Sequence, residues 1–260
     1  MGILNVTPDS FSDGGQFFDP AAAVRRGREL AAQGADVIDV GGESTRPRAR
    51  PVAAQEELDR VLSVIHELSA SLKTPISIDT SKAAVADAAL QAGACLINDV
   101  TALTGDPAMA AVAARAGAAV ILMHMQGTPQ SMQDHPRYRD VTQDVAGGLA
   151  AAAGRAQAAG IARERILLDP GIGFGKTAAH SLSLLQRLDR LVALGYPVVL
   201  GPSRKSFIGA LVGGEPHERL GGTLAAVAAA RARGVHMVRV HDVQPTVQFL
   251  RLLDLLEPGA

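Results

Sequence analysis

Charged and amide side chains follow short apolar runs along the chain, and these residue types can bind a polar ligand. A half-buried carboxylate costs free energy unless it has a partner, and a ligand rich in hydrogen-bond donors is such a partner. The exposure of run ends to water explains one or two such residues, but not a series. The runs end in Asn5, Asp39, Asp79, Asn98, His124, Asp169, Arg239 and His241, and Lys82, Lys176 and Lys205 follow shortly after runs.

The stretch DPGIGFGKT (169–177) has the glycines, lysine and threonine of a phosphate-binding loop, but its spacing excludes both common types. A P-loop requires a glycine five positions before Gly175, where this chain has Pro170. A dinucleotide fingerprint requires G-x-G-x-x-G, whereas the run here is G-x-G-x-G. The glycines therefore make a tight loop, and the role of Asp169 must follow from its place in the fold.

Other arrangements that carry chemistry are incomplete. The His-Glu pair at 217–218 has no second histidine for a zincin helix, and Ser44 and Ser203 lack the glycines of a nucleophile elbow. Cys95 is the single cysteine and stands in an apolar run, which predicts a small buried hydrophobe. For His124 two interpretations stay open, namely a packed histidine at the mouth of the fold and a ligand-binding residue.

The apolar runs are short, rich in β-branched residues and nearly continuous, which is typical of parallel strands covered on both faces. Segments of helical period separate them, so the pattern predicts an α/β fold, a single (β/α)8 TIM barrel whose site lies at the carboxyl ends of the strands. The rival is a doubly wound sheet, which would need a glycine-rich first turn that is lacking here. The expected strands are 3–6, 37–40, 76–79, 96–99, 120–124, 166–169, 198–201 and 237–241.

Helix signals stand between these strands. Residues 20–34 and 55–72 have helical period, and Asp19 and Asp106, each followed by proline, predict N-caps. Glycines are expected to end the helices at positions 34, 93, 117, 160 and 195.

Composition narrows the class of protein. The chain has 260 residues, 47% of them hydrophobic, and nothing resembling a linker, so we expect one domain over 1–260. The net charge of −1 and the lack of tryptophan give no reason to expect a nucleic acid or a membrane surface as partner. Neither a signal peptide nor a membrane-spanning run is recognised, so a cytoplasmic protein is expected.

Seven motifs together resemble dihydropteroate synthase, over essentially the whole chain and in order. They are MGILNVTPDSFSDGG (1–15), IDVGGESTRP (38–47), IDTSK (78–82), INDV (97–100), LDPGIGFGK (168–176), SRKS (203–206) and RVHDV (239–243). The resemblance implies condensation of 6-hydroxymethyl-7,8-dihydropterin diphosphate with p-aminobenzoate to 7,8-dihydropteroate and pyrophosphate in folate biosynthesis. It also implies Mg²⁺, a homodimer and sensitivity to sulfonamides.

The resemblance implies roles for residues in these motifs. Catalysis would involve Asn5, Asp79, Lys205, Arg239 and His241, and Asn5 would also hold the metal. The pterin would contact Asp79, Asn98, Asp169, Lys205 and Arg239, and the diphosphate would contact Asn5, Thr45, Arg239 and His241. The p-aminobenzoate would contact Thr45, Arg46, Pro47, Phe174, Ser203 and Arg204. Asp13 would be an acidic residue of the first loop.

The expected chemistry is dissociative. Positive charge left by the departing diphosphate can delocalise into the dihydropterin, so charge stabilisation and positioning would carry the rate without a covalent intermediate. The loops 7–15 and 42–51 are expected to close over the site. Two alternatives stay open: a methyltetrahydrofolate methyltransferase domain linked to a corrinoid, and a paralogue that binds pterin without turnover.

Overall fold

Eight parallel strands follow one another around a barrel in the computed structural model, which describes residues 1–7, 19–45 and 49–256. The first six form one sheet in chain order, and the last two pair with each other. Isolated parallel bridges, Leu168–Val198 and Gly2–Val240, join the two sheets and complete the ring. The strands are β1 (Gly2–Asn5), β2 (Ile38–Gly41), β3 (Ile76–Asp79), β4 (Leu96–Asp99), β5 (Ala119–Met123), β6 (Ile166–Asp169), β7 (Val199–Leu200) and β8 (Met237–Val238).

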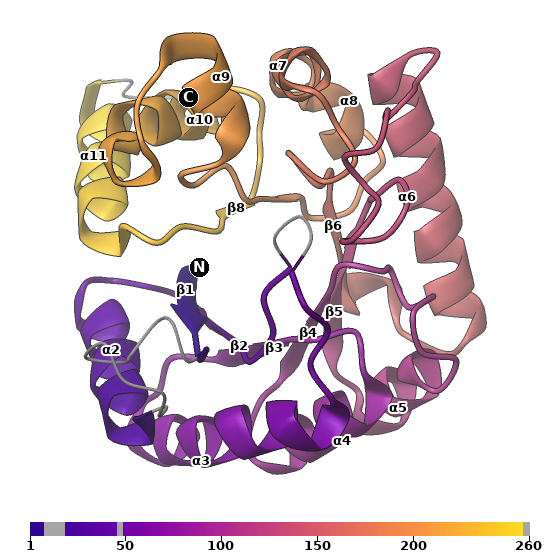
Figure 1. Ribbon diagram of the computed structural model, residues 1–260, viewed down its shortest axis with the longest axis vertical. Helices are drawn as coiled ribbons and strands as arrows, with labels where there is room; N and C mark the ends of the chain where they lie inside the picture. The colour runs from indigo at the N-terminus through magenta and orange to yellow at the C-terminus, as the bar shows by residue number, and fades with distance from the viewer. Residues whose placement is uncertain (8–18, 46–48, 257–260) are drawn as a thin grey trace.

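The TIM-barrel prediction is confirmed, and the doubly wound rival is wrong. A doubly wound sheet reverses its strand order at a switch point, whereas here each strand pairs with its neighbour in sequence. Helices form an outer ring around the strands (Figure 1). They are α2 (Pro20–Ala32), α3 (Ala54–Ser71), α4 (Ala83–Gln91), α5 (Met109–Ala116), α6 (Val141–Ala158), α7 (Ala178–Gln186), α8 (Asp189–Val192), α9 (Ser206–Val212), α10 (Leu220–Arg231) and α11 (Val243–Leu256), with 3-10 turns at Arg163–Arg165 and Pro216–Glu218.

The helix ends mostly follow the sequence signals. Asp19 caps α2 by accepting a hydrogen bond from the backbone N–H of Ala21 at 2.9 Å. The N-cap predicted at Asp106 is wrong, because α5 begins only at Met109. Asp106 instead accepts from the backbone N–H groups of Ala108 and Ala83, each at 2.9 Å, and so also caps the first turn of α4. The five glycines expected at helix ends all have positive φ.

The inside of the barrel is apolar at one end and polar at the other. Strand pairing places Asn5 opposite Gly41, Gly41 opposite Asp79, and Asp79 opposite Asn98, so the polar side chains share one level at the carboxyl ends. Below that level a separate apolar cluster fills the barrel, which makes this end a packed core. It contains Met1, Leu96, Ile121 and Val199, with Val37, Ala119, Leu167 and Met237 packed against it.

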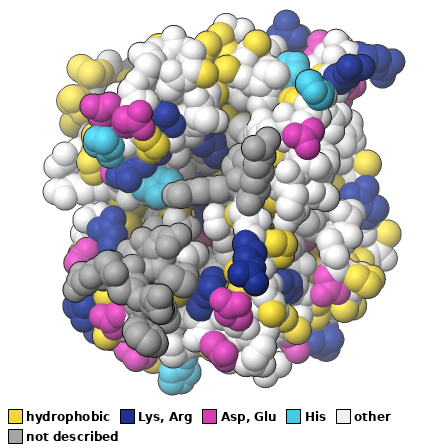
Figure 2. Space-filling model, in the orientation of Figure 1, with side chains coloured by type: hydrophobic (Ala, Val, Ile, Leu, Met, Phe, Trp, Pro, Cys, Tyr) yellow, Lys and Arg dark blue, Asp and Glu magenta, His cyan; other side chains and the backbone are white. Residues whose placement is uncertain are grey.

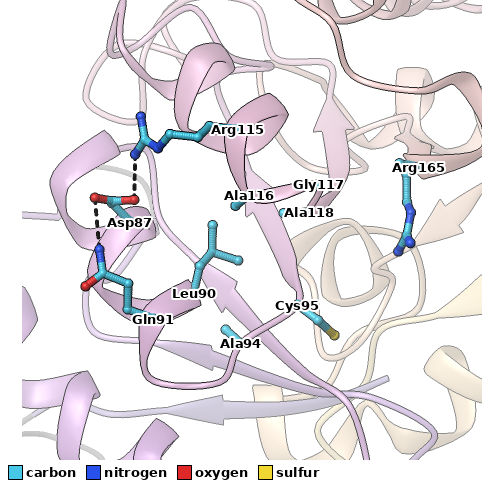
Figure 3. A pocket seen from close by; sticks show the side chains of 10 residues that line it. All are labelled: Asp87, Leu90, Gln91, Ala94, Cys95, Arg115, Ala116, Gly117, Ala118 and Arg165. Carbon is cyan, nitrogen blue, oxygen red and sulfur yellow. Dashed lines mark hydrogen bonds and ion pairs between the residues drawn. The ribbon is translucent and has the colours of Figure 1, made fainter.

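Cys95 lies at the opposite end of the barrel from these polar side chains, and the prediction that it is buried is wrong. It directly precedes β4, so its side chain is exposed rather than packed within the strand. With Arg115 and Arg165 it lines a hollow of about 370 Å³, shown in Figure 3, in which Arg115 is paired with Asp87. Because this hollow is remote from the carboxyl ends of the strands, it is not the predicted site.

The surface carries charge of both signs. Acidic and basic side chains are interspersed over the face drawn in Figure 2, in agreement with the net charge of −1. Within the described residues, no helix is both long and apolar enough to cross a membrane.

Candidate active site

Arg239 is bound by two carboxylates inside the mouth of the barrel. Its Nε donates to Oδ2 of Asp39 at 2.5 Å, and its Nη2 donates to Oδ2 of Asp79 at 2.7 Å. Asn98 donates from Nδ2 to the same Oδ2 of Asp39 at 3.0 Å. Arg239, Asp79 and Asn98, which were predicted to contact the pterin, therefore lie together with Asp39. Asp39 had no role assigned from the sequence beyond its place at a strand end.

Burial and pairing set the charges of this group. Burial raises the pKa of Asp79 above its usual range, and the guanidinium of Arg239 opposes that shift. Burial acts to lower the pKa of Arg239, but the carboxylates of Asp39 and Asp79 outweigh it and raise that pKa above its usual value. Arg239 is therefore a fixed cation, and most of its charge is already matched by protein groups.

Asp169 and Lys205 form the second polar group of the mouth. Oδ1 of Asp169 accepts a hydrogen bond from the backbone N–H of Gly171 at 2.7 Å, and the ammonium of Lys205 donates to the carbonyl of Ile172. Burial raises the pKa of Asp169, with Lys205 opposing. Burial also lowers the pKa of Lys205 to about 8, although the charge of Asp169 acts in the other direction.

The glycines that follow Asp169 allow this loop to cross the end of β5 at close range. A Cβ added to Gly171 would lie 2.0 Å from the carbonyl oxygen of His124, and one added to Gly175 would lie 2.5 Å from that of Gln126. Both glycines also have positive φ, which a side chain disfavours. The glycines thus serve the approach of two backbones, which agrees with the exclusion of a nucleotide loop by spacing.

Lys176 holds the far end of the same loop. Its ammonium donates to Nδ1 of His124 at 3.2 Å, to the carbonyl of His124 at 3.1 Å and to the carbonyl of Phe174 at 3.0 Å. Burial, followed by the charge of Lys176, lowers the pKa of His124 to about 4. His124 is therefore neutral and uses Nδ1 within the protein, which favours the packed-histidine interpretation. Sequence reasoning missed this pair, although it placed both residues after strand ends.

His241 and Ser203 connect the loops after β8 and β7. Oγ of Ser203 lies 3.0 Å from Nδ1 of His241 and accepts from its backbone N–H at 3.2 Å. The neighbouring Arg204 pairs through Nε and Nη2 with Asp242, at 3.0 and 2.5 Å. Ser203, predicted to contact p-aminobenzoate, thus lies against His241, predicted to contact the diphosphate, whereas the guanidinium of Arg204 already has a carboxylate partner.

Asn5 lies half-buried at the end of β1, and its side chain makes no hydrogen bond with the described residues. Mg²⁺ characteristically takes few protein ligands and completes its shell with water and substrate phosphate. The side-chain amide oxygen of Asn5 at the mouth of the barrel is suited to be one such protein ligand. Among residues 1–7, 19–45 and 49–256, no cluster of three His, Cys, Asp or Glu side chains could hold a metal by itself.

The remaining predicted residues belong to the loops. Thr45 and Phe174 are half-buried. Nζ of Lys205 lies over the Phe174 ring, 4.6 Å from the ring centroid. The predictions for Asp13, Arg46 and Pro47 fall outside the described residues.

Fold and site together define a class: a TIM-barrel protein with a mixed carboxylate, amide and cation site at the carboxyl ends of its strands, suited to a polar small molecule that carries an anion. The family described as pterin binding enzyme matches residues 1–241. The chain therefore belongs to the pterin-binding enzymes, and its relatives place it among the dihydropteroate synthases.

Three relatives illustrate the similarity. The dihydropteroate synthase of Synechocystis is 46% identical over 98% of this chain and 89% of its own length. The crystal structure of the Xanthomonas albilineans enzyme with 4-aminobenzoic acid has a TM-score of 0.94 at 46% identity, covering 100% of this chain and 93% of that one. The Yersinia pestis enzyme with a sulfonamide drug has a TM-score of 0.93 at 44% identity, covering 98% and 92%.

Proposed function

We propose that this chain condenses 6-hydroxymethyl-7,8-dihydropterin diphosphate with p-aminobenzoate, giving 7,8-dihydropteroate and pyrophosphate on the route to folate. The observation that carries the proposal is the gathering of Asp79, Asn98, Asp169, Lys205 and Arg239 at one end of the barrel. Identity of 46% to dihydropteroate synthases over nearly the whole chain supports the same reaction.

The pterin is recognised at its edge. A dihydropterin presents a 2-amino group and a ring N–H side by side, and a carboxylate accepts both. Asp169 suits this role because only its Oδ1 is bound, by Gly171, while its Oδ2 has no hydrogen-bond partner among the described residues. Lys205 would donate to an acceptor on the opposite edge, and Asn98 and Asp79 would complete the contacts. Arg239 would lay its guanidinium against the ring.

The diphosphate leaves toward His241 and Asn5. Departure places positive charge on the pterin methylene and ring, close to the carboxylates of Asp79 and Asp169, which stabilise it. The Ser203 contact orients the imidazole of His241. Mg²⁺, held by Asn5, would neutralise charge on the diphosphate oxygens when bound. The arylamine is neutral at pH 7 and attacks the methylene carbon next to Thr45 and Phe174. The nitrogen then releases one proton to water, so no strong base is needed.

A cytoplasmic homodimer completes the proposal. Half of the large exposed hydrophobic side chains within the described residues, Leu182, Leu211 and Val212, line one groove between α7, α9 and α10. Association of two copies of the chain through this groove would remove these hydrophobic side chains from water, which favours a dimer. Sedimentation should show a dimer that Leu211→Asp weakens, and a monomer at high concentration would contradict the assignment.

The function is tested by incubating the protein with the pterin diphosphate, with and without p-aminobenzoate and Mg²⁺. We expect pyrophosphate release and 7,8-dihydropteroate, identified by mass spectrometry, only with the complete mixture. Tight pterin binding without product would favour the inactive paralogue. Calorimetric binding of methyltetrahydrofolate, without pyrophosphate release in the first assay, would favour the methyltransferase domain.

A further inference from the structure

Glu43 connects the two ends of the loop between β2 and α3. Its Oε1 accepts a hydrogen bond from the backbone N–H of Val52 at 2.9 Å, nine residues later in the chain. Its Oε2 accepts from the ammonium of Lys82 at 2.6 Å, and Lys82 directly precedes α4. A single carboxylate therefore joins the start of this loop, its end and a different loop of the barrel mouth.

Lys82 anchors Glu43 to the helix layer. The same ammonium donates to Oε2 of Glu57 at 2.5 Å, and Glu57 on α3 is fully buried. Burial would lower the pKa of Lys82, but the hydrogen bonds and charges of Glu43 and Glu57 reverse the direction and raise it. Lys82 is thus a stable cation shared by two carboxylates, and the charge-assisted bonds fix their geometry.

The residue before Glu43 is held as firmly. The carbonyl of Gly42 accepts from Nη1 of Arg60 on α3 at 2.6 Å. A Cβ at Gly42 would lie 2.8 Å from a methyl group of Val61 and 3.0 Å from Cγ of Glu57. The beginning of the loop therefore packs closely against α3 at Gly42. The bond to Lys82 then fixes the orientation of the next side chain, Glu43.

We propose that Glu43, held by Lys82, is a positioning residue for the arylamine substrate. The inference rests on the proposed function, in which Thr45 contacts p-aminobenzoate. Thr45 comes two residues after Glu43, so the carboxylate that ties residue 43 to Lys82 and Val52 also limits where Thr45 stands. The pterin-edge residues Asp169 and Asn98 lie on strands, so loss of the Glu43 bonds leaves them in place.

The direct test is Glu43→Gln. The amide keeps one oxygen for Val52 but turns an N–H group toward the ammonium of Lys82. We expect the KM for p-aminobenzoate to rise about tenfold, the usual effect of losing one charge-assisted bond, while the KM for the pterin diphosphate stays within about twofold. Glu67→Gln is the matched control, because Glu67 is exposed on the same helix as Glu57. It should change neither KM.

A double-mutant cycle tests whether Glu43 acts through Lys82. Lys82→Met alone would leave Glu57 buried and unpaired, which threatens folding, so Glu57→Gln is the background for every member of the cycle. Lys82→Met and Glu43→Gln should each raise the KM for p-aminobenzoate there, and the double change should raise it no further. A KM for p-aminobenzoate that rises in the double variant by the product of the two single rises would overturn the inference.

The outcomes separate this inference from the proposed function. A wild-type chain that forms no dihydropteroate would overturn the proposed function, and the inference with it. A wild-type chain that is active would leave the function intact. In that case an unchanged KM for p-aminobenzoate in Glu43→Gln, or equal rises in both KM values, would overturn the positioning role alone.

Discussion

Nε of Arg239 lies 2.5 Å from Oδ2 of Asp39, joining two residues 200 positions apart across the inside of the barrel. Asp39 is fully buried, and its Oδ1 has no hydrogen-bond partner in the described part of the chain. The pair therefore links the segment after β8 to β2 while it holds the guanidinium at the site. Arg239, which we propose contacts the pterin, is thus also the structural counter-ion of Asp39.

Replacement of Arg239 should consequently cost stability as well as activity. Arg239→Met leaves Asp39 buried without its cation, and we expect a loss of about 3 kcal/mol in the free energy of unfolding. Arg239→Met combined with Asp39→Asn should recover part of that loss without restoring activity. Urea denaturation gives the free energy of unfolding of the single and the double variant. Equal values for the two variants would show that the buried charge of Asp39 is not destabilising without Arg239.

Lys205 predicts an upper limit to the pH range of activity. Its pKa in the folded protein is lowered to about 8 by burial, so the ammonium that would contact the pterin is lost above that pH. We expect kcat/KM for the pterin diphosphate to fall about tenfold per pH unit above pH 8, and Lys205→Arg to remove this fall. The same profile in Lys205→Arg would assign the titration to another group.

The same lysine should affect stability in the opposite direction. Its pKa is lower in the folded chain than the usual lysine value of 10.5, so the unfolded chain binds more protons between pH 8 and 10.5. The contribution of Lys205 to stability is therefore complete above pH 10.5 and lost as the pH falls through 8. Wild-type protein should gain more stability than Lys205→Arg between pH 8 and 10 in urea denaturation, and equal gains would contradict the shift.

Two glycines separate backbone strain from close approach. Gly171 and Gly117 have similar φ values, +66° and +61°, but a Cβ on Gly117 would meet no atom within 4 Å, whereas one on Gly171 would overlap the carbonyl of His124. Gly117→Ala should cost about 1 kcal/mol of stability, and Gly171→Ala at least about 2 kcal/mol more with lower pterin affinity. Equal losses in thermal unfolding would mean that the loop after β6 does not need this approach.

The sequence predicted the barrel because each strand carries its own signal. The first six expected strands agree with the structure to within one residue at each end, since their β-branched runs are nearly continuous. The runs at 198–201 and 237–241 contain only two residues each of regular strand, and Val198 and Val240 in these runs make only isolated bridges to the neighbouring strands. Local pattern therefore located the polar strand ends that form the candidate site.

What the sequence did not predict depends on distant partners. The bond from Asp39 to Arg239 and the contact of Lys176 with His124 arise only when the barrel closes. Cys95 was misplaced for a related reason: an apolar neighbourhood indicates a strand, but not which residue stands just outside it. Pairings of this kind follow from tertiary structure, which residue types and spacing do not encode locally.

We propose that Asp169 binds the pterin edge at the mouth of the barrel, and the variant Asp169→Asn tests this role. The amide oxygen can still accept from Gly171, so the loop keeps its bond, while the new N–H group opposes the N–H groups of the pterin. Measured from dihydropteroate formation, kcat/KM for the pterin diphosphate should fall about 30- to 100-fold, equivalent to about 2–3 kcal/mol, with unfolding unchanged. An unchanged kcat/KM in the folded variant would contradict the claim and reduce Asp169 to a residue that only shapes its own loop.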